Sequence, residues 1–156
     1  MTASRLVEIL KEKKLTVSTA ESCTGGMVAQ LITSVSGASE VFKYGAVTYA
    51  NETKEKVLGV KAGTLSEYGA VSHETAREMA EGVRETMDAD IGVSVTGLAG
   101  PSPAEGKEVG LVYIGISSDF GTFSIENHFS GSRDDIRRAS ADKAISLAFE
   151  EAVKFD

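Results

Sequence analysis

Hydroxyl groups stand beside glycines where the chain is expected to leave a strand and enter a helix. The segment 19–26 reads TAESCTGG, with Ser22 after a β-branched run and Gly25 and Gly26 before an apolar helical stretch. Backbone N–H groups at a helix start can bind an anion, and glycines allow a substrate to approach closely. A serine placed there could act as a nucleophile beside an oxyanion site. A plain strand-to-helix turn, with glycines for tight packing, explains the pattern equally well.

A second junction combines a phenol with a lysine. The segment 47–54 reads VTYANETK, so Tyr49 is expected at a strand end and Lys54 in the first turn of the next helix. The positive end of the helix dipole and partial burial both disfavour a charged ammonium group, so Lys54 could act as a base. The alternative is a solvated Lys54 paired with Glu52 or Glu55, which is the commoner situation for a lysine.

A third segment, 94–101, reads SVTGLAGP and again ends a predicted strand in a glycine-rich loop. Thr96, Gly97 and Gly100 are arranged there as in loops that bind phosphate through backbone N–H groups. The segment is not a Walker loop, because no Gly-Lys-Ser/Thr follows at the required spacing.

A fourth segment, 129–135, reads FSGSRDD and places Arg133 at the start of a helix. The guanidinium group could bind an anionic ligand through two hydrogen bonds. The alternative is an ion pair with Asp134 or Glu126.

Cys23 follows Ser22 directly and offers a second nucleophile, for which His73 or His128 would be the base. Neither histidine lies in a recognisable motif, although such pairs are assembled in space and not in sequence. A lone cysteine is more often a small buried apolar residue.

Composition excludes several classes of protein. The chain has 156 residues, a formal net charge of −7, one cysteine and two histidines. One cysteine rules out an internal disulfide and suits a reducing cytoplasm, and a Cys/His-rich structural zinc site is excluded. The acidic balance argues against nucleic acid as a partner. No apolar run is long enough for a membrane helix, and a signal peptide is not evident, so we expect a cytoplasmic protein with no membrane partner.

The hydrophobic periodicity predicts a single α/β domain over residues 1–156, a layered structure in which helices flank a mixed sheet. Strands are predicted over 15–20, 41–49, 91–96, 111–117 and 122–129. Helices are predicted over 3–10, 27–32, 51–57, 73–87 and 132–152.

Three polar residues are expected to cap these helices. Asn51 is predicted as the cap of the third helix, Ser72 as that of the fourth, and Ser132 with Asp135 as a near capping box at the last. Met87 is expected on the buried side of the fourth helix.

Five segments occur together in order, namely 19–26, 47–54, 69–72, 96–101 and 129–133. This set resembles the C-terminal domain of the competence/damage-inducible protein CinA, a family in which the domain also occurs alone as a nicotinamide-nucleotide amidase. The resemblance spans essentially the whole chain, and five ordered motifs are far more specific than one glycine-rich turn.

The resemblance implies hydrolysis of the carboxamide of nicotinamide mononucleotide to nicotinate mononucleotide and ammonia, with no metal or other cofactor. It implies that Ser22 is the nucleophile, Lys54 its general base and Tyr49 part of the hydroxyl network. Backbone N–H groups after Ser22 would form the oxyanion hole, and the loop from Thr96 would meet the ribose phosphate with Arg133, Arg137 being a weaker candidate. The implied substrate-binding residues are Cys23, Thr24, Gly25, Gly26, Thr96, Gly97, Gly100, Arg133 and Arg137.

One segment departs from the family pattern. Residues 101–110 read PSPAEGKEVG, where the family often has a glycine-rich stretch leading to Lys-Pro-Val-Gly. We therefore expect this loop to close over the site differently. The expected partners are a small nucleotide and further copies of the chain, in a dimer or larger homo-oligomer. A non-catalytic module that binds nucleotides or regulates remains the alternative function.

Overall fold

One five-stranded sheet organises the computed structural model, which describes residues 2–156. Its strands are β1 (Val17–Glu21), β2 (Phe42–Val47), β3 (Ile91–Gly97), β4 (Leu111–Ser118) and β5 (Gly121–His128). They lie in the order β2-β1-β3-β4-β5, with β2, β1 and β3 parallel and β4 and β5 antiparallel to their neighbours. The predicted mixed sheet is confirmed.

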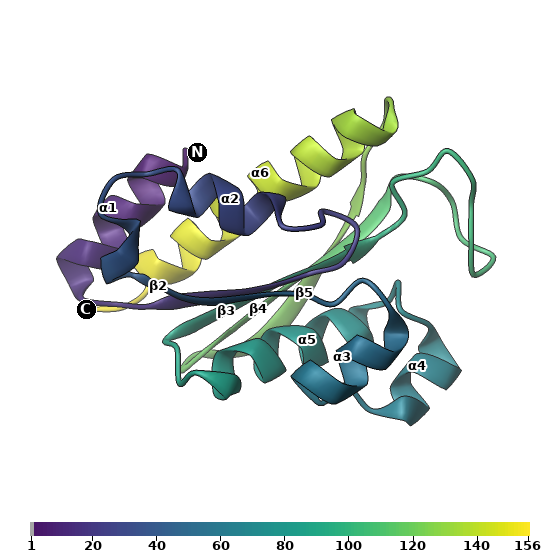
Figure 1. Cartoon of the computed structure of the whole chain (residues 1–156), viewed down its shortest axis with the longest axis horizontal. Helices are drawn as coiled ribbons and strands as arrows, with labels where there is room; N and C mark the ends of the chain where they lie inside the picture. The colour runs from purple at the N-terminus through teal and green to yellow at the C-terminus, as the bar shows by residue number, and fades with distance from the viewer. Residues whose placement is uncertain (1) are drawn as a thin grey trace.

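Helices cover both faces of the sheet (Figure 1). One layer holds α1 (Ala3–Lys13), α2 (Met27–Thr33) and α6 (Arg133–Val153), and the other holds α3 (Asn51–Leu58), α4 (Ala62–Tyr68) and α5 (His73–Thr86). Because both faces are covered, every residue of β1 is buried, as expected for a central strand in a parallel arrangement. Within residues 2–156, none of the helices is both long and apolar enough to cross a membrane.

Apolar stripes hold the two layers to the sheet. Leu6 and Leu10 of α1 and Ile145 of α6 belong to the main core on one side. Met79 and Val83 of α5 form a second cluster on the other. Each of these side chains is at most 2% exposed, and burying one of this size stabilises the fold by about 1.5–3 kcal/mol.

Two of the three predicted helix caps are confirmed. Ser72 Oγ accepts a hydrogen bond from the Thr75 N–H at 3.1 Å. Ser132 and Asp135 form a complete capping box at α6. The third prediction was wrong, because Asn51 is the first helical residue of α3 and the extended Ala50 precedes it without a side-chain cap.

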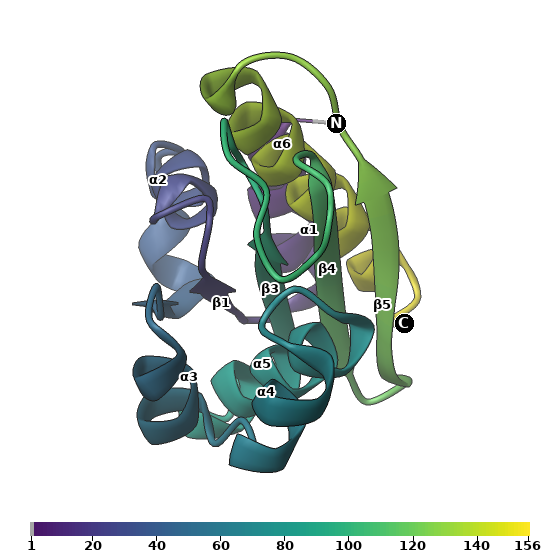
Figure 2. The ribbon, with the colours of Figure 1, turned by 90° about the vertical axis from the view of Figure 1, so that its right-hand side faces the viewer.

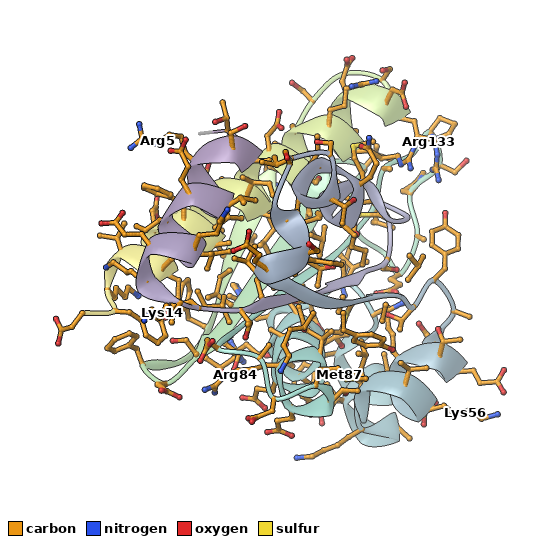
Figure 3. The ribbon with its side chains drawn as sticks, turned by 60° about the vertical axis from the view of Figure 1, so that its left-hand side comes forward. Arg5, Lys14, Lys56, Arg84, Met87 and Arg133 are labelled. Carbon is orange, nitrogen blue, oxygen red and sulfur yellow. The ribbon has the colours of Figure 1, made fainter. Side chains whose placement is uncertain are left out.

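The sequence missed two short elements and misplaced one side chain. The 3₁₀ turn η1 (Ala38–Glu40) and α4 were not predicted, and α4 buries none of its residues, so it has no apolar stripe to detect. Met87 is 46% exposed instead of buried, because α5 ends one residue before it (Figure 3).

The carboxyl ends of the three parallel strands meet at one edge of the sheet. Glu21, the last residue of β1, lies opposite Val47 of β2 and Val95 of β3. The residues that follow these positions are therefore brought together, at the place where ligands bind in open α/β sheets. Figure 2 views the molecule from this edge, with the loop 98–110 between the two helix layers.

Candidate active site

A pocket of about 270 Å³ opens at this edge of the sheet. It is formed by the turn after β1, the connection from β2 into α3, the turn before α5, the loop 98–110 and the start of α6. The lining residues are Ser22, Cys23, Tyr49, Asn51, Lys54, Ala70, Val71, Thr96, Gly97, Leu98, Ala99, Gly100, Ser102, Glu105 and Arg133.

Lys54 and Ser22 meet at the base of this pocket. Helix α3 turns Lys54 and Leu58 inward on one face, and Lys54 is only 1% exposed. Its Nζ lies 3.0 Å from Ser22 Oγ, 2.7 Å from the Thr48 carbonyl oxygen and 3.4 Å from the Tyr49 carbonyl oxygen. The solvated lysine paired with Glu52 or Glu55 is therefore excluded.

These three contacts suit both protonation states of the amine, because an ammonium group can donate to all three oxygens. A neutral lysine has two N–H donors and one lone pair, and the two carbonyl oxygens can accept only from the donors. The lone pair is then left for the Ser22 hydroxyl proton, which is the arrangement that a general base requires.

Burial lowers the pKa of Lys54 from its ordinary value of 10.5 to about 8. Desolvation is the largest cause, because removing the amine from water disfavours its charged form. Cys23 and Glu105 act in the opposite direction and limit the shift. A substantial fraction of Lys54 is thus neutral near pH 8.

The turn that carries Ser22 is held from several sides. The Ser22 N–H donates to the Val95 carbonyl oxygen at 2.9 Å, which ties it to β3. The buried Glu21 carboxylate accepts from the N–H groups of Val28 and Ala29 at the start of α2. Gly25 adopts the left-handed conformation, with a φ of 59°, that a tight turn needs. The Ser22 hydroxyl is therefore fixed relative to Lys54.

Arg137 belongs to this framework and not to the pocket. Its guanidinium donates to the carbonyl oxygens of Cys23 and Thr24, each at 3.1 Å, and lies 3.6 Å from the Asp134 carboxylate. Arg137 lies on α6, and Thr24, Gly25 and Gly26 lie in the turn between β1 and α2; none of the four lines the pocket. These bonds hold Arg137 against the turn that carries Ser22, and its contact with the phosphate stays a prediction.

Within residues 2–156, neither histidine is hydrogen-bonded to Cys23. The Cys23 thiol is buried, which raises the pKa of this group to about 11. His73 bonds to Ser124 on β5, and His128 bonds to Glu126. The cysteine-histidine pairing considered from the sequence is not formed, since both rings contact β5 and the thiol lies at the end of β1.

The Tyr49 phenol bonds to Arg133. Its oxygen accepts from Arg133 Nη2 at 3.0 Å, and the side chain is largely exposed. Arg133 Nη1 also donates to the Gly100 carbonyl oxygen at 2.5 Å. Arg133 thus stands at the rim of the pocket at the start of α6 (Figure 3). Within residues 2–156, the hydrogen bond between Tyr49 and Lys54 is made by the Tyr49 carbonyl oxygen, and the role of the phenol in a hydroxyl network stays a prediction.

The end of β3 and the loop after it contribute Thr96, Gly97 and Gly100 to the pocket lining. The Thr96 hydroxyl is buried and donates to the Ala70 carbonyl oxygen at 2.8 Å. A Cβ on Gly97 would lie 2.6 Å from Val112 Cγ2, so β4 packs too closely there for a side chain. Gly100 has a φ of 82°, which a larger residue rarely adopts.

Sequence reasoning missed one charged residue of the pocket. Glu105 comes from the segment that departs from the family pattern, and its carboxylate accepts from the Ala70 and Val71 N–H groups at 3.2 Å each. No local sequence pattern shows which acidic residue of a long loop turns inward. Among residues 2–156, no three His, Cys, Asp or Glu side chains are grouped to hold a metal ion.

The chain is similar to known proteins in sequence and in fold. The family model described as the CinA C-terminal domain matches residues 1–152. The chain is 51% identical to a CinA-like protein of Endomicrobium trichonymphae over 93% of its own length and 34% of the relative. The chain spans about a third of the length of the curated relatives that it matches.

Two solved structures match over nearly their whole length. A competence/damage inducible protein from Agrobacterium tumefaciens is 38% identical, with a TM-score of 0.91 and coverage of 95% of this chain and 92% of that one. The competence damage-inducible protein A of Klebsiella pneumoniae is 28% identical, with a TM-score of 0.93 and full coverage of both chains.

Proposed function

The chain belongs to the CinA C-terminal domain family, and we propose that it hydrolyses the carboxamide of nicotinamide mononucleotide to nicotinate mononucleotide and ammonia. The contact between Lys54 Nζ and Ser22 Oγ, at 3.0 Å in a buried setting, is the observation that carries this proposal. It supplies an activated hydroxyl at the base of a pocket open to a small molecule.

In the first half of the reaction, Ser22 Oγ forms a bond to the carboxamide carbon and its proton passes to Lys54 Nζ. The carbonyl electron pair moves onto oxygen and gives a tetrahedral intermediate. The carbon–nitrogen bond then breaks as Lys54 returns the proton to the leaving nitrogen. Ammonia departs and an ester remains on Ser22.

In the second half, a water molecule attacks the ester and gives its proton to Lys54. The bond from carbon to Ser22 Oγ breaks, and Oγ regains the proton from Lys54. The product is a carboxylic acid, which loses its proton to solvent and leaves as a carboxylate. Lys54 is neutral at the start and at the end of the cycle.

The backbone after Ser22 offers donors for the developing oxyanion. Within residues 2–156, the N–H groups of Cys23 and Thr24 donate to no backbone carbonyl oxygen. We assign the oxyanion to these two groups, because donors that are fixed before the reaction stabilise charge without reorganisation. We assign the phosphate to Arg133, the cationic group at the pocket rim.

Ammonia release from nicotinamide mononucleotide tests the proposal. We expect activity in the wild type and a loss of at least about a hundredfold in both Ser22→Ala and Lys54→Met. Lys56→Met is the matched control, since Lys56 lies on the same helix, points to solvent and pairs with Glu52 (Figure 3). Full activity in either active-site variant would refute the proposed pair.

The alternative, a module that binds nucleotides without catalysis, has a different signature. Calorimetry would then show tight binding of the mononucleotide to the wild type with no ammonia released. Turnover that depends on Ser22 would reject that alternative.

A further inference from the structure

The loop 98–110 places a carboxylate in a pocket that is otherwise cationic. Among the described lining residues, Lys54 and Arg133 are the basic side chains and Glu105 is the acidic one. The phosphate of a mononucleotide needs Arg133, and the reacting amide needs Lys54 and Ser22. Neither role requires an acid, so the function proposed above leaves Glu105 unexplained.

Glu105 is held firmly in this position. Its two carboxylate oxygens accept from the Ala70 and Val71 N–H groups, each at 3.2 Å. Gly69 leaves room for the carboxylate, since a Cβ at that position would lie 2.2 Å from Glu105 Oε1. Two backbone donors and a closely fitted glycine thus orient one side chain of a long loop.

Lys107 supports Glu105 from outside the pocket. Its Nζ lies 3.2 Å from Glu105 Oε1 and also donates to the Tyr68 and Val71 carbonyl oxygens. Glu105 lines the pocket and Lys107 does not. The ion pair is therefore oriented with its negative end toward the ligand. The charge also acts inside the pocket, because it raises the pKa of Lys54 against the effect of burial.

We propose that Glu105 is a specificity-determining residue that favours substrates with a positively charged ring at the carboxamide end. This inference rests on the proposed function, because the oxidised nicotinamide ring carries its positive charge on the nitrogen that bears the ribose. A ring whose amide reaches Ser22 brings that charge into the part of the pocket that Glu105 lines. The carboxylate, on a side chain that is 30% exposed, would stabilise that positive charge by direct attraction.

The test compares two ligands that differ in ring charge. Nicotinamide mononucleotide has a cationic ring, and its 1,4-dihydro form has the same carboxamide, ribose and phosphate with an uncharged ring. Calorimetry on Ser22→Ala protein measures their binding without turnover. The comparison is repeated after adding Glu105→Gln, Glu105→Asp or Lys107→Met, with a thermal melt to verify folding.

We expect Glu105→Gln to weaken binding of the cationic ligand by about tenfold and that of the dihydro ligand by less than about twofold. Glu105→Asp should keep most of the preference, because the charge remains. Lys107→Met should keep or increase the preference for the cationic ligand, because the Glu105 carboxylate then no longer pairs with the Lys107 ammonium group.

If the ion pair between Glu105 and Lys107 only holds the loop in place, the substitutions should affect the two ligands in another way. Glu105→Gln and Lys107→Met would then weaken both ligands by a common factor, and this result would overturn the inference. If the wild type releases ammonia but Glu105→Gln leaves the ligand preference unchanged, only the role of Glu105 fails. If the wild type neither binds nor hydrolyses the mononucleotide, the proposed function and this inference fail together.

Discussion

The buried amine of Lys54 makes the proposed reaction depend on pH in a defined range. With a pKa of about 8, roughly a tenth of Lys54 is neutral at pH 7, compared with about 0.03% for a lysine at 10.5. Burial therefore increases the active fraction roughly 300-fold. Since the neutral form is the base, activity should fall as the pH decreases through this pKa. Between pH 8 and pH 6 the neutral fraction falls about 50-fold.

The assay is kcat/KM for ammonia release from nicotinamide mononucleotide, measured from pH 5.5 to pH 9.5. We expect an acid limb with an apparent pKa near 8 in the wild type and in Lys56→Met. Lys54→Met should lose the activity itself. A value of kcat/KM that stays constant down to pH 6, or an acid limb whose apparent pKa lies near the ordinary lysine value, would refute the role of Lys54 as the base.

The same burial predicts how stability depends on pH. Below about pH 8 Lys54 is charged in both the folded and the unfolded chain, and the cost of burying that charge is fully present. Between about pH 8 and pH 10.5 only the unfolded chain keeps the proton, so the folded state gains stability as the pH rises. Relative to Lys54→Met, the free energy of unfolding of the wild type should rise by roughly 3 kcal/mol over this range. Urea denaturation of both proteins at pH 7.5 and pH 10.5 measures this change. If the free energies of unfolding of the two proteins differ by the same amount at both pH values, the lowered pKa of Lys54 is contradicted.

Three further substitutions test other parts of the site. Cys23→Ala should keep at least about half of the rate of ammonia release, because burial keeps the thiol protonated; a loss as large as that of a nucleophile would restore Cys23 as a candidate. Arg133→Met should raise KM for the mononucleotide about tenfold or more and barely change KM for the nucleoside, which lacks the phosphate. Arg138→Met is the control, because Arg138 is exposed on the same helix. Equal effects on both substrates would argue against a phosphate contact. Gly69→Ala should lower the free energy of unfolding by about 2 kcal/mol, because it strains a φ of 80° and collides with Glu105; an unchanged denaturation midpoint would show that the carboxylate is not held as described.

The strongly patterned elements could be predicted from the sequence. The apolar stripe of α5 and the capping residues Ser72 and Ser132 depend on neighbours within a few positions, so their local pattern is complete. By contrast, α4 buries no residue and carries no stripe. Its position follows from contacts with α5, including the bond from Thr64 to Glu78, which no local pattern contains.

The site was only partly accessible to the same reasoning. Ser22, Lys54 and Arg133 were assigned to one site, and the structure places all three around one pocket. A signal for the burial of Lys54 was present, because Leu58 lies one turn later on the same face of the helix. The directions of Tyr49 and Arg137 could not be predicted, since each depends on a partner more than 80 residues away.

The sequence by itself determined the α/β layering, the strand-to-loop junctions and the presence of a serine and a lysine in motifs typical of one family. These properties follow from periodicity and from residue types at short spacing. Tertiary structure alone decided how the pKa of the lysine is lowered and that Glu105, and not Arg137, lines the pocket. Those outcomes depend on desolvation and on parallel strands ending at one edge, and both arise only when distant segments pack together.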